Sequence, residues 1–312
     1  MDDSYQMDDH EFMSVEEYDD LINNPGEFFL TKVIPRKYKA LSFLSELQVS
    51  DPLESMFFGQ LEIFDRPDVR IALDALKEAG RAAKVWNQGW SEIFAEFDKQ
   101  GIPLGAGVGH PCPFDLLADT TRGLLNTVMD IYSCPDKVLA AVDVMTEICI
   151  KQAVGRTKNA GLKYLFIPLH AGVDEFMSPE HYKKFYWPGL QKMICALVEN
   201  DITPYIFCEG KYHQRLDIIS DVPPGKVIYT FEDVDMKKAK ETVGKVACIG
   251  GNLPTSLLAY GKKEQVVEAT KRLLDIGAPG GGFLMDCSII LDNAKRENLE
   301  AWEETTRLYG KY

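Results

Sequence analysis

The segment TPYIFCEG, residues 203–210, decides the fold class of this chain. It is an apolar run that turns polar only at its end, where Cys208 and Glu209 stand side by side before Gly210. A short apolar run bounded by turn signals is typical of a buried strand in a parallel sheet. Polar residues at the carboxyl end of such a strand indicate a functional site at that edge of the sheet.

The same pattern recurs along the chain. Amphipathic helical segments separate the recurrences, for instance residues 178–200, where Ser178 is the expected N-cap and Pro179 the first helical residue. This alternation predicts βα units around a parallel sheet, in a (β/α)8 TIM-type barrel or a doubly wound fold. The chain has no G-x-G-x-x-G opening a helix and no G-x-x-x-x-G-K-[ST], which weakens the nucleotide-binding version. The other five expected strands are 102–109, 163–170, 226–233, 245–252 and 281–288.

Residues 1–59 predict an acidic helical N-terminal region, and residues 60–312 predict the barrel domain. A capping box at Ser14–Glu17 is expected to open a short helix that ends near Asn23. Residues 27–100 read as mostly helical, with breaks at Asp51–Pro52 and Arg66–Pro67. Because six strands are two short of eight, we expect either two unrecognised strands or a barrel that lacks its first strand or two.

Composition excludes several classes of function. The formal net charge is −14 and no basic run occurs, which argues against nucleic acid and anionic membranes as partners. No apolar stretch reaches the roughly 18–20 residues that span a bilayer, and no signal peptide opens the sequence. The seven cysteines are odd in number and scattered, so we expect free thiols in a reducing cytoplasm.

Candidate site residues lie where the expected strands end. His170 and Asp174 follow the strand at 163–170, and a loop carried by a rigid barrel often bears function. Glu209 needs a partner, because an unpaired buried charge costs several kcal/mol. That partner is either a site group or, as the alternative, Arg215 or a neighbouring lysine. Asn252 is expected either to orient a bound substrate or cofactor or to hold its turn.

Four segments together resemble the uroporphyrinogen decarboxylase superfamily, which includes zinc- and corrinoid-dependent methyltransferases. The resemblance covers roughly residues 100–312 and implies a (β/α)8 barrel with its site at the carboxyl ends of the strands. The segments are SPEHYKKFYWPGLQKMI (178–194), EGKYHQRLDII (209–219), GGNLPTSLLAYGKKEQVVEATKRLL (250–274) and GGFLMDCSIILDNAKRENLEAW (281–302).

The methyltransferase branch carries a zinc motif, H-x-C-G at one strand end and a lone Cys at a later one. The resemblance places Glu209 on the first motif Cys, Phe207 on its His and Cys287 on the lone Cys. Zinc accepts carboxylate as well as thiolate and imidazole, so the resemblance implies a Zn²⁺ site at Glu209 and Cys287, with His170 or Cys208 contributing. For Cys287 and Cys208, a buried core thiol is the alternative.

The implied function is a methyltransferase that moves a methyl group between a small methoxy or thiol compound and a corrinoid protein, with Zn²⁺ as Lewis acid. The corrinoid is expected on a separate carrier protein, since no D-x-H-x-x-G segment occurs. The oligomeric state is open, a homodimer included.

Two alternatives remain. The decarboxylase branch grips its substrate with an N-terminal Arg-rich loop, and the first 60 residues contain only Arg36, which disfavours uroporphyrinogen itself. A metal-free, decarboxylase-like lyase could still use Asp174 or Glu209 as proton donor. Relatives also begin with a strand carrying R-x-P or R-V-P, which this sequence lacks, so a shortened member, part of a longer reading frame or a truncated non-catalytic partner subunit is the further expectation.

Overall fold

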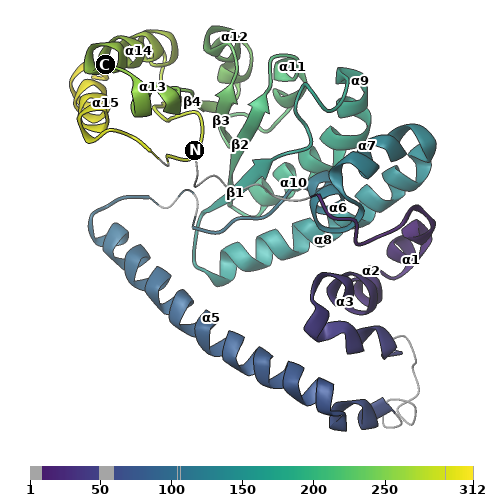
Figure 1. Cartoon of the computed structure of the whole chain (residues 1–312). Helices are drawn as coiled ribbons and strands as arrows, with labels where there is room; N and C mark the ends of the chain where they lie inside the picture. Colours follow the sequence, from purple (N-terminus) through teal and green to yellow (C-terminus); the bar gives the residue numbers. More distant parts are fainter. Residues whose placement is uncertain (1–8, 49–59, 104, 106, 292, 312) are drawn as a thin grey trace. The chain divides into compact units, whose positions relative to one another are not determined.

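Five parallel strands form one sheet in the chain order β1-β2-β3-β4-β5 (Figure 1). The structure, a computed structural model, describes residues 9–48, 60–103, 105, 107–291 and 293–311. The expected break at Asp51–Pro52 lies outside the described residues. The strands are β1 (Tyr164–Leu169), β2 (Thr203–Lys211), β3 (Ile228–Asp233), β4 (Cys248–Gly251) and β5 (Phe283–Leu284).

The two faces of the sheet differ in burial because successive side chains of a strand point to opposite faces. In β1, Leu165, Ile167 and Leu169 are fully buried, whereas Phe166 on the other face is half-buried. Strand β2 alternates in the same way. One face therefore packs against helices, and the other carries a more open, partly aromatic surface.

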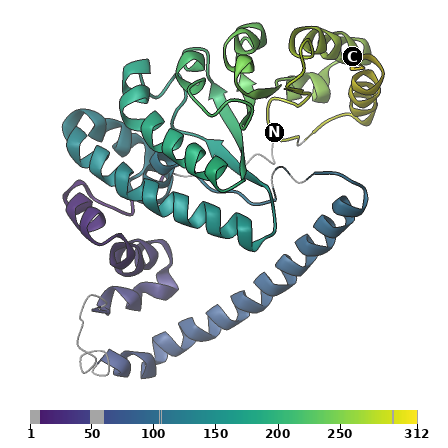
Figure 2. The same ribbon diagram turned by 180° about the vertical axis from the view of Figure 1, so that it is seen from behind.

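The helices that link the strands belong to the same unit, which comprises residues 105–115 and 145–312. Figure 2 shows this part from the opposite side, with the helices lying along the sheet. Ser178 accepts a hydrogen bond from the His181 N–H and Pro179 is the first residue of α9, as predicted. The elements are α9 (Pro179–His181), η6 (Tyr182–Tyr186), α10 (Trp187–Glu199), α11 (Leu216–Ile219), α12 (Met236–Glu241), η7 (Val243–Lys245), α13 (Thr255–Tyr260), α14 (Lys263–Gly277) and α15 (Arg296–Tyr309).

The segment 102–109, expected to be a strand, contributes only one parallel bridge among its described residues. Gly109 pairs with Phe166 of β1, and the His110 N–H donates to the Phe166 carbonyl at 3.0 Å. Glycine recurs at every second residue from 105 to 109. Glycine weakens a strand because it has no side chain to pack.

The other unit comprises residues 1–104 and 116–144 and is helical in its described part. The Ser14 N–H donates to Glu17 Oε2 at 2.9 Å, half of the predicted capping box, and the helix that follows ends at Asn23 as expected. The elements are η1 (Val15–Glu17), α1 (Tyr18–Asn23), α2 (Pro25–Phe28), η2 (Phe29–Val33), α3 (Ile34–Lys37), η3 (Lys39–Glu46), η4 (Leu61–Asp65), α5 (Pro67–Lys99), η5 (Ala118–Arg122) and α7 (Leu124–Ser133); α6 (Pro113–Leu117) and α8 (Pro135–Asn159) run between the two units.

A buried ion pair between Arg122 and Asp130 connects the start of the chain's described part to η5 and α7. Arg122 Nε lies 2.7 Å from Asp130 Oδ2, which also accepts the Tyr18 hydroxyl at 2.9 Å. Arg122 donates further to Glu11 and to the Met13 carbonyl. Because each charge has several partners, their hydrogen bonds offset part of the desolvation cost of burying the pair.

The α/β class is therefore confirmed, with a parallel sheet at its centre. The predicted boundary between residues 59 and 60 stays a prediction. Across the described ranges, no helix combines the length and the apolar character needed to cross a membrane.

Candidate active site at the carboxyl ends of the strands

The loop after β1 is fixed by one buried carboxylate, that of Asp115. It accepts the backbone N–H of His170 at 2.9 Å, that of Ala171 at 3.0 Å and the Tyr186 hydroxyl at 2.8 Å. Asp115 is 1% exposed, so these donors replace water around its charge. Sequence reasoning missed this residue, because an Asp in PCPFDLL looks like an ordinary first-turn helix residue.

His170 and Asp174, both predicted site residues, follow in this loop. The His170 side chain is exposed, and its ring meets the Phe176 ring edge-on at 6.2 Å. Asp174 accepts the Gln214 N–H at 3.1 Å and lies 3.6 Å from Arg215 Nε. Asp174 therefore ties the loop after β1 to the loop after β2.

Arg215 completes that connection between the two loops. It is fully buried, donates to the carbonyls of Gly172, Val173 and Met177, and its guanidinium lies 4.8 Å from the centre of the Tyr182 ring. The alternative partner expected for Glu209 was this arginine, and the carboxylate beside it is that of Asp174. The loop after β1 is thus held from both of its ends.

Cys208 and Glu209 point to opposite faces of β2. Cys208 is fully buried on the helix-covered face. Burial raises the pKa of the Cys208 thiol well above its usual value. The structure therefore does not bring Cys208 together with Glu209, and it places the thiol in the core position that was the alternative expectation.

Glu209 follows the alternation of β2 and lies half-buried on the face that carries Tyr205 and Phe207. The residue after it, Gly210, has a φ of +76°, and a Cβ there would come within 2.8 Å of Val173. Only glycine adopts this backbone and fits this space without strain. The Gly210 N–H donates to Glu232 Oε2 at 2.7 Å, which fixes the backbone next to Glu209.

Asn252 follows β4 at the same edge of the sheet. Its side-chain NH₂ donates to the Val234 carbonyl at 3.1 Å. This is the contact expected of a residue that holds a turn, the second of the two predicted alternatives. A contact between Asn252 and a cofactor stays a prediction.

Asp286 and Cys287 lie just after β5, the last strand of the sheet. The Cys287 thiol donates to the Ile289 carbonyl at 3.1 Å. Burial is the main cause, and the nearby Asp286 carboxylate the second cause, that raises the pKa of this thiol to about 11. Asp286 accepts the Cys287 N–H at 2.8 Å and the Tyr205 hydroxyl at 3.3 Å. Burial raises the pKa of Asp286.

Asp286 was not among the predicted site residues. Its position directly before Cys287, at the end of an expected strand, is the sequence feature that could have marked it as a site residue. The bond from Tyr205 joins it to the open face of β2, so this carboxylate faces the same side of the sheet as Glu209. That side carries the aromatic rings of Phe166 and Phe207, which stack with centres 6.4 Å apart.

The candidate zinc donors are a carboxylate and a thiol. Within the described residues, no three or more His, Cys, Asp and Glu side chains gather as a metal site. Glu209 and Cys287 nonetheless offer a carboxylate and a thiol at carboxyl ends of strands in one sheet, and zinc accepts both types. The chemistry of these two donors fits zinc, whereas Cys208 lies on the other face.

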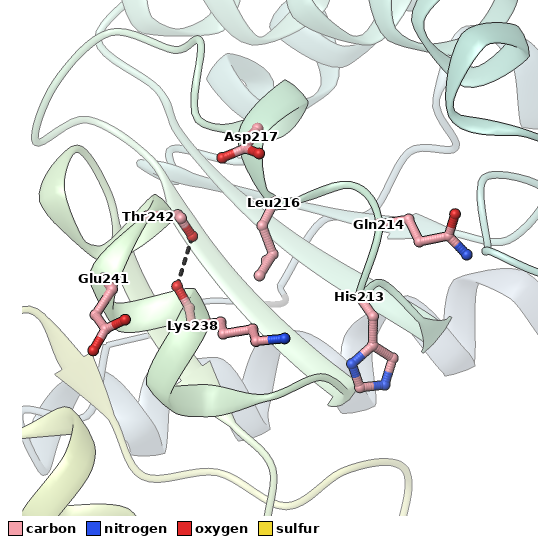
Figure 3. Close-up of a pocket in the computed structure, with 7 residues that line it drawn as sticks. All are labelled: His213, Gln214, Leu216, Asp217, Lys238, Glu241 and Thr242. Atoms are coloured by element: carbon pink, nitrogen blue, oxygen red, sulfur yellow. Dashed lines mark hydrogen bonds between the residues drawn. The ribbon is translucent and has the colours of Figure 1, made fainter.

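A separate cavity of about 210 Å³ lies between α11 and α12, outside the predicted site (Figure 3). His213 lies at its rim, with its Nε2 3.3 Å from Asp233. None of the predicted site residues lines it. Its lining is His213, Gln214, Leu216, Asp217, Lys238, Glu241 and Thr242.

The sequence matches one protein family and two curated relatives. The model of the family described as uroporphyrinogen decarboxylase matches residues 91–309. The chain is 26% identical over 180 residues to the methylcobamide:CoM methyltransferase MtbA of Methanosarcina acetivorans, which is 58% of this chain and 52% of that protein. The MtbA of Methanosarcina mazei matches with the same identity and coverage.

Among solved structures, a methyltransferase from Methanosarcina mazei matches with a TM-score of 0.54 and 19% identity, over 65% of this chain and 58% of that one. This likeness concerns the fold. The chain spans about half the length of the curated relatives it matches.

Proposed function

The chain belongs to the uroporphyrinogen decarboxylase family, in its methyltransferase branch, and from this we propose that it transfers methyl groups. The observation that carries the proposal is the match over 180 residues to two methylcobamide:CoM methyltransferases. The reaction moves a methyl group between a small methoxy or thiol compound and a corrinoid. The corrinoid is carried by a separate protein, in keeping with the methylcobamide in the names of these relatives.

Glu209 and Cys287 are the residues that would hold Zn²⁺, with the exposed His170 after β1 as a further nitrogen donor. Bound there, Zn²⁺ supplies a Lewis acid that polarises an ether oxygen or lowers the pKa of a thiol. Cys287 must lose its proton to become a ligand, and its raised pKa makes that loss costly without a metal. Gly210 and Glu232 hold Glu209 in position.

The open face of the sheet would bind the substrate. Phe166 and Phe207 offer apolar surface, and Tyr205 and Asp286 offer polar groups beside it. Apolar walls with few polar groups are typical of small-molecule sites. Asp174 keeps the loop after β1 beside this face, so its proposed contribution to catalysis is to position His170.

The proposal is tested by methyl transfer from methylcobalamin to a thiol, followed by the absorbance change of the corrinoid. The full chain should transfer methyl groups, and treatment with a chelator should abolish transfer until zinc is restored. Activity that survives complete chelation would reject the zinc step. Absence of transfer from methylcobalamin by a folded, zinc-loaded chain, with alcohol and thiol acceptors alike, would reject the methyltransferase.

A further inference from the structure

Helix α5 (Pro67–Lys99) runs for 33 residues without a break and is about 50 Å long (Figure 1). Only its first turns are covered by neighbouring residues of its own unit. Val69 and Ala72 are buried against Phe43, with Ile63 and Phe64 packed around them. Beyond Leu73, nearly every residue of α5 is exposed to solvent.

The apolar stripe of α5 continues far past the covered turns. From Val69 onward, apolar residues alternate at spacings of three and four, which is the heptad pattern of a coiled coil. Trp86 is 67% exposed and Ile93 is 44% exposed. The residues of this stripe, called here the α5 stripe, are Leu76, Ala79, Ala83, Trp86, Trp90, Ile93 and Phe97.

The aromatic part of the stripe forms one continuous surface. The ring centres of Trp86 and Trp90 lie 5.9 Å apart, and Phe94, which flanks the stripe, has its ring centre 5.6 Å from that of Trp90. Exposed aromatic and aliphatic side chains in a contiguous patch mark an interaction surface more often than isolated exposed residues do. Scattered charges on the opposite side of α5 leave that side suited to water.

We propose that the α5 stripe pairs with the same stripe of a second copy of this chain, antiparallel, around a two-fold axis beside Gln88. In this register Trp86 packs on Trp90 of the partner subunit, Ala83 on the partner's Ile93, and Ala79 on the partner's Phe97. Each a position of one helix then meets a d position of the other. A symmetric, self-complementary contact of this kind is the commonest way to build a dimer.

Side-chain size selects this orientation. The N-terminal half of the stripe is small at Ala79 and Ala83, and the C-terminal half is large at Ile93 and Phe97. An antiparallel pair sets each small residue against a large one. A parallel pair would set alanine against alanine and phenylalanine against phenylalanine, which leaves voids in some layers and crowding in others.

Charge selects the same orientation. Residues 77–84 carry three basic side chains and one acidic, a net charge of +2, since Lys77, Arg81 and Lys84 outnumber Glu78. In this register they face residues 92–99 of the partner subunit, where three acidic side chains outnumber one basic side chain, Lys99, a net charge of −2. An antiparallel pair brings the basic segment of each helix alongside the acidic segment of the other, whereas a parallel pair brings like charges together.

The first test is the mass of the full chain in solution, by analytical ultracentrifugation. The wild type should have twice the 35.1 kDa chain mass. Ile93→Glu places a charge in the stripe and should give a monomer with unchanged helix content. The matched control is Val85→Glu, because Val85 is 73% exposed but lies outside the stripe, and this variant should remain a dimer. A monomeric wild type, or a dimer that survives Ile93→Glu, would overturn the proposal.

Engineered cysteines test the orientation. Gly89 lies next to the proposed axis, so Gly89→Cys should form a disulfide with its own copy, seen as a dimer on a non-reducing gel above the wild-type background. Ala79→Cys should not, because its partner position is Phe97. Self-linking through residue 79, or a dimer that links through neither position, would contradict the antiparallel register.

Discussion

The Tyr205 hydroxyl lies 3.3 Å from the Asp286 carboxylate, although their strands are not neighbours in the sheet. Strands β3 and β4 separate β2 from β5, a distance of about 14 Å in a flat sheet. A tyrosine and an aspartate cannot bridge that distance across a flat sheet. Asp286 lies two residues beyond the end of β5, so the curvature of the sheet and the turn after β5 together bring its carboxylate to the open face of β2.

Tyr205→Phe removes the hydrogen bond to Asp286 and should change two measurable quantities, the pKa of Asp286 and the free energy of unfolding. The Tyr205 bond lowers the pKa of Asp286 against the larger effect of burial, so its loss should raise that pKa further. The free energy of unfolding should fall by about 1 kcal/mol, as for one hydrogen bond. NMR titration of the Asp286 carboxyl and urea unfolding measure the two effects. Tyr260→Phe, at a site 71% exposed, is the control, and equal effects in both variants would contradict the contact.

Gly210→Ala should destabilise the protein and displace Glu209. The cost has two parts, the positive φ and the 2.8 Å approach of the new Cβ to Val173. Gly225→Ala is a matched control, because Gly225 has a φ of +71° but nothing within 4 Å of its Cβ position. Gly225→Ala should cost about 1 kcal/mol and Gly210→Ala about 2 kcal/mol or more. Equal losses in urea unfolding would remove the steric part of the argument.

Asp115→Ala should be among the most destabilising changes in its unit. It leaves two backbone N–H groups and the Tyr186 hydroxyl without their acceptor, at an expected cost of about 3 kcal/mol. Asp143→Ala, at an exposed position of α8, should cost less than about 0.5 kcal/mol. The free energy of unfolding from urea titration checks both. Similar values for the two variants would show that Asp115 does not hold the loop.

The pH dependence of Cys287 alkylation follows from its pKa. A thiol with a pKa of about 11 is protonated at pH 7, and its thiolate fraction rises about tenfold per pH unit up to that value. In metal-free protein, the rate of iodoacetamide reaction at Cys287, read by peptide mass spectrometry, should still be rising above pH 9. Free cysteine, run as the control, should level off near pH 9. A plateau at Cys287 near pH 8 would contradict the buried thiol.

Periodicity in the sequence predicted most of the sheet, because β1 to β4 are apolar runs bounded by turn residues. Among its described residues, the first expected strand forms only the bridge at Gly109, because its glycines supply no side chains to pack. The last expected strand shortened to Phe283–Leu284, because the residues after it turn to place Asp286 and Cys287. A pattern of neighbouring residues does not show contacts between residues that lie far apart in the sequence.

The location of the site at the carboxyl ends of the strands stays a prediction. The structure places Cys208 and Glu209 on opposite faces of β2, because successive side chains of a strand alternate. The contributions of Asp115 and Asp286 depend on partners far away in the sequence, Tyr186 and Tyr205, so no local motif marks them. The sequence predicted Arg215 only as a partner for Glu209. Its position beside Asp174 depends on how the loops after β1 and β2 pack together.

The most direct test of the central claim is the zinc content of the purified full chain, measured by elemental analysis for the wild type, Glu209→Ala and Cys287→Ala. Cys195→Ala, a half-buried thiol on α10, is the matched control. The account predicts about one zinc per chain in the wild type and in Cys195→Ala, and a loss of most of it in the other two variants. A folded wild type that binds no zinc when it is supplied, or zinc that persists in both site variants, would contradict the account.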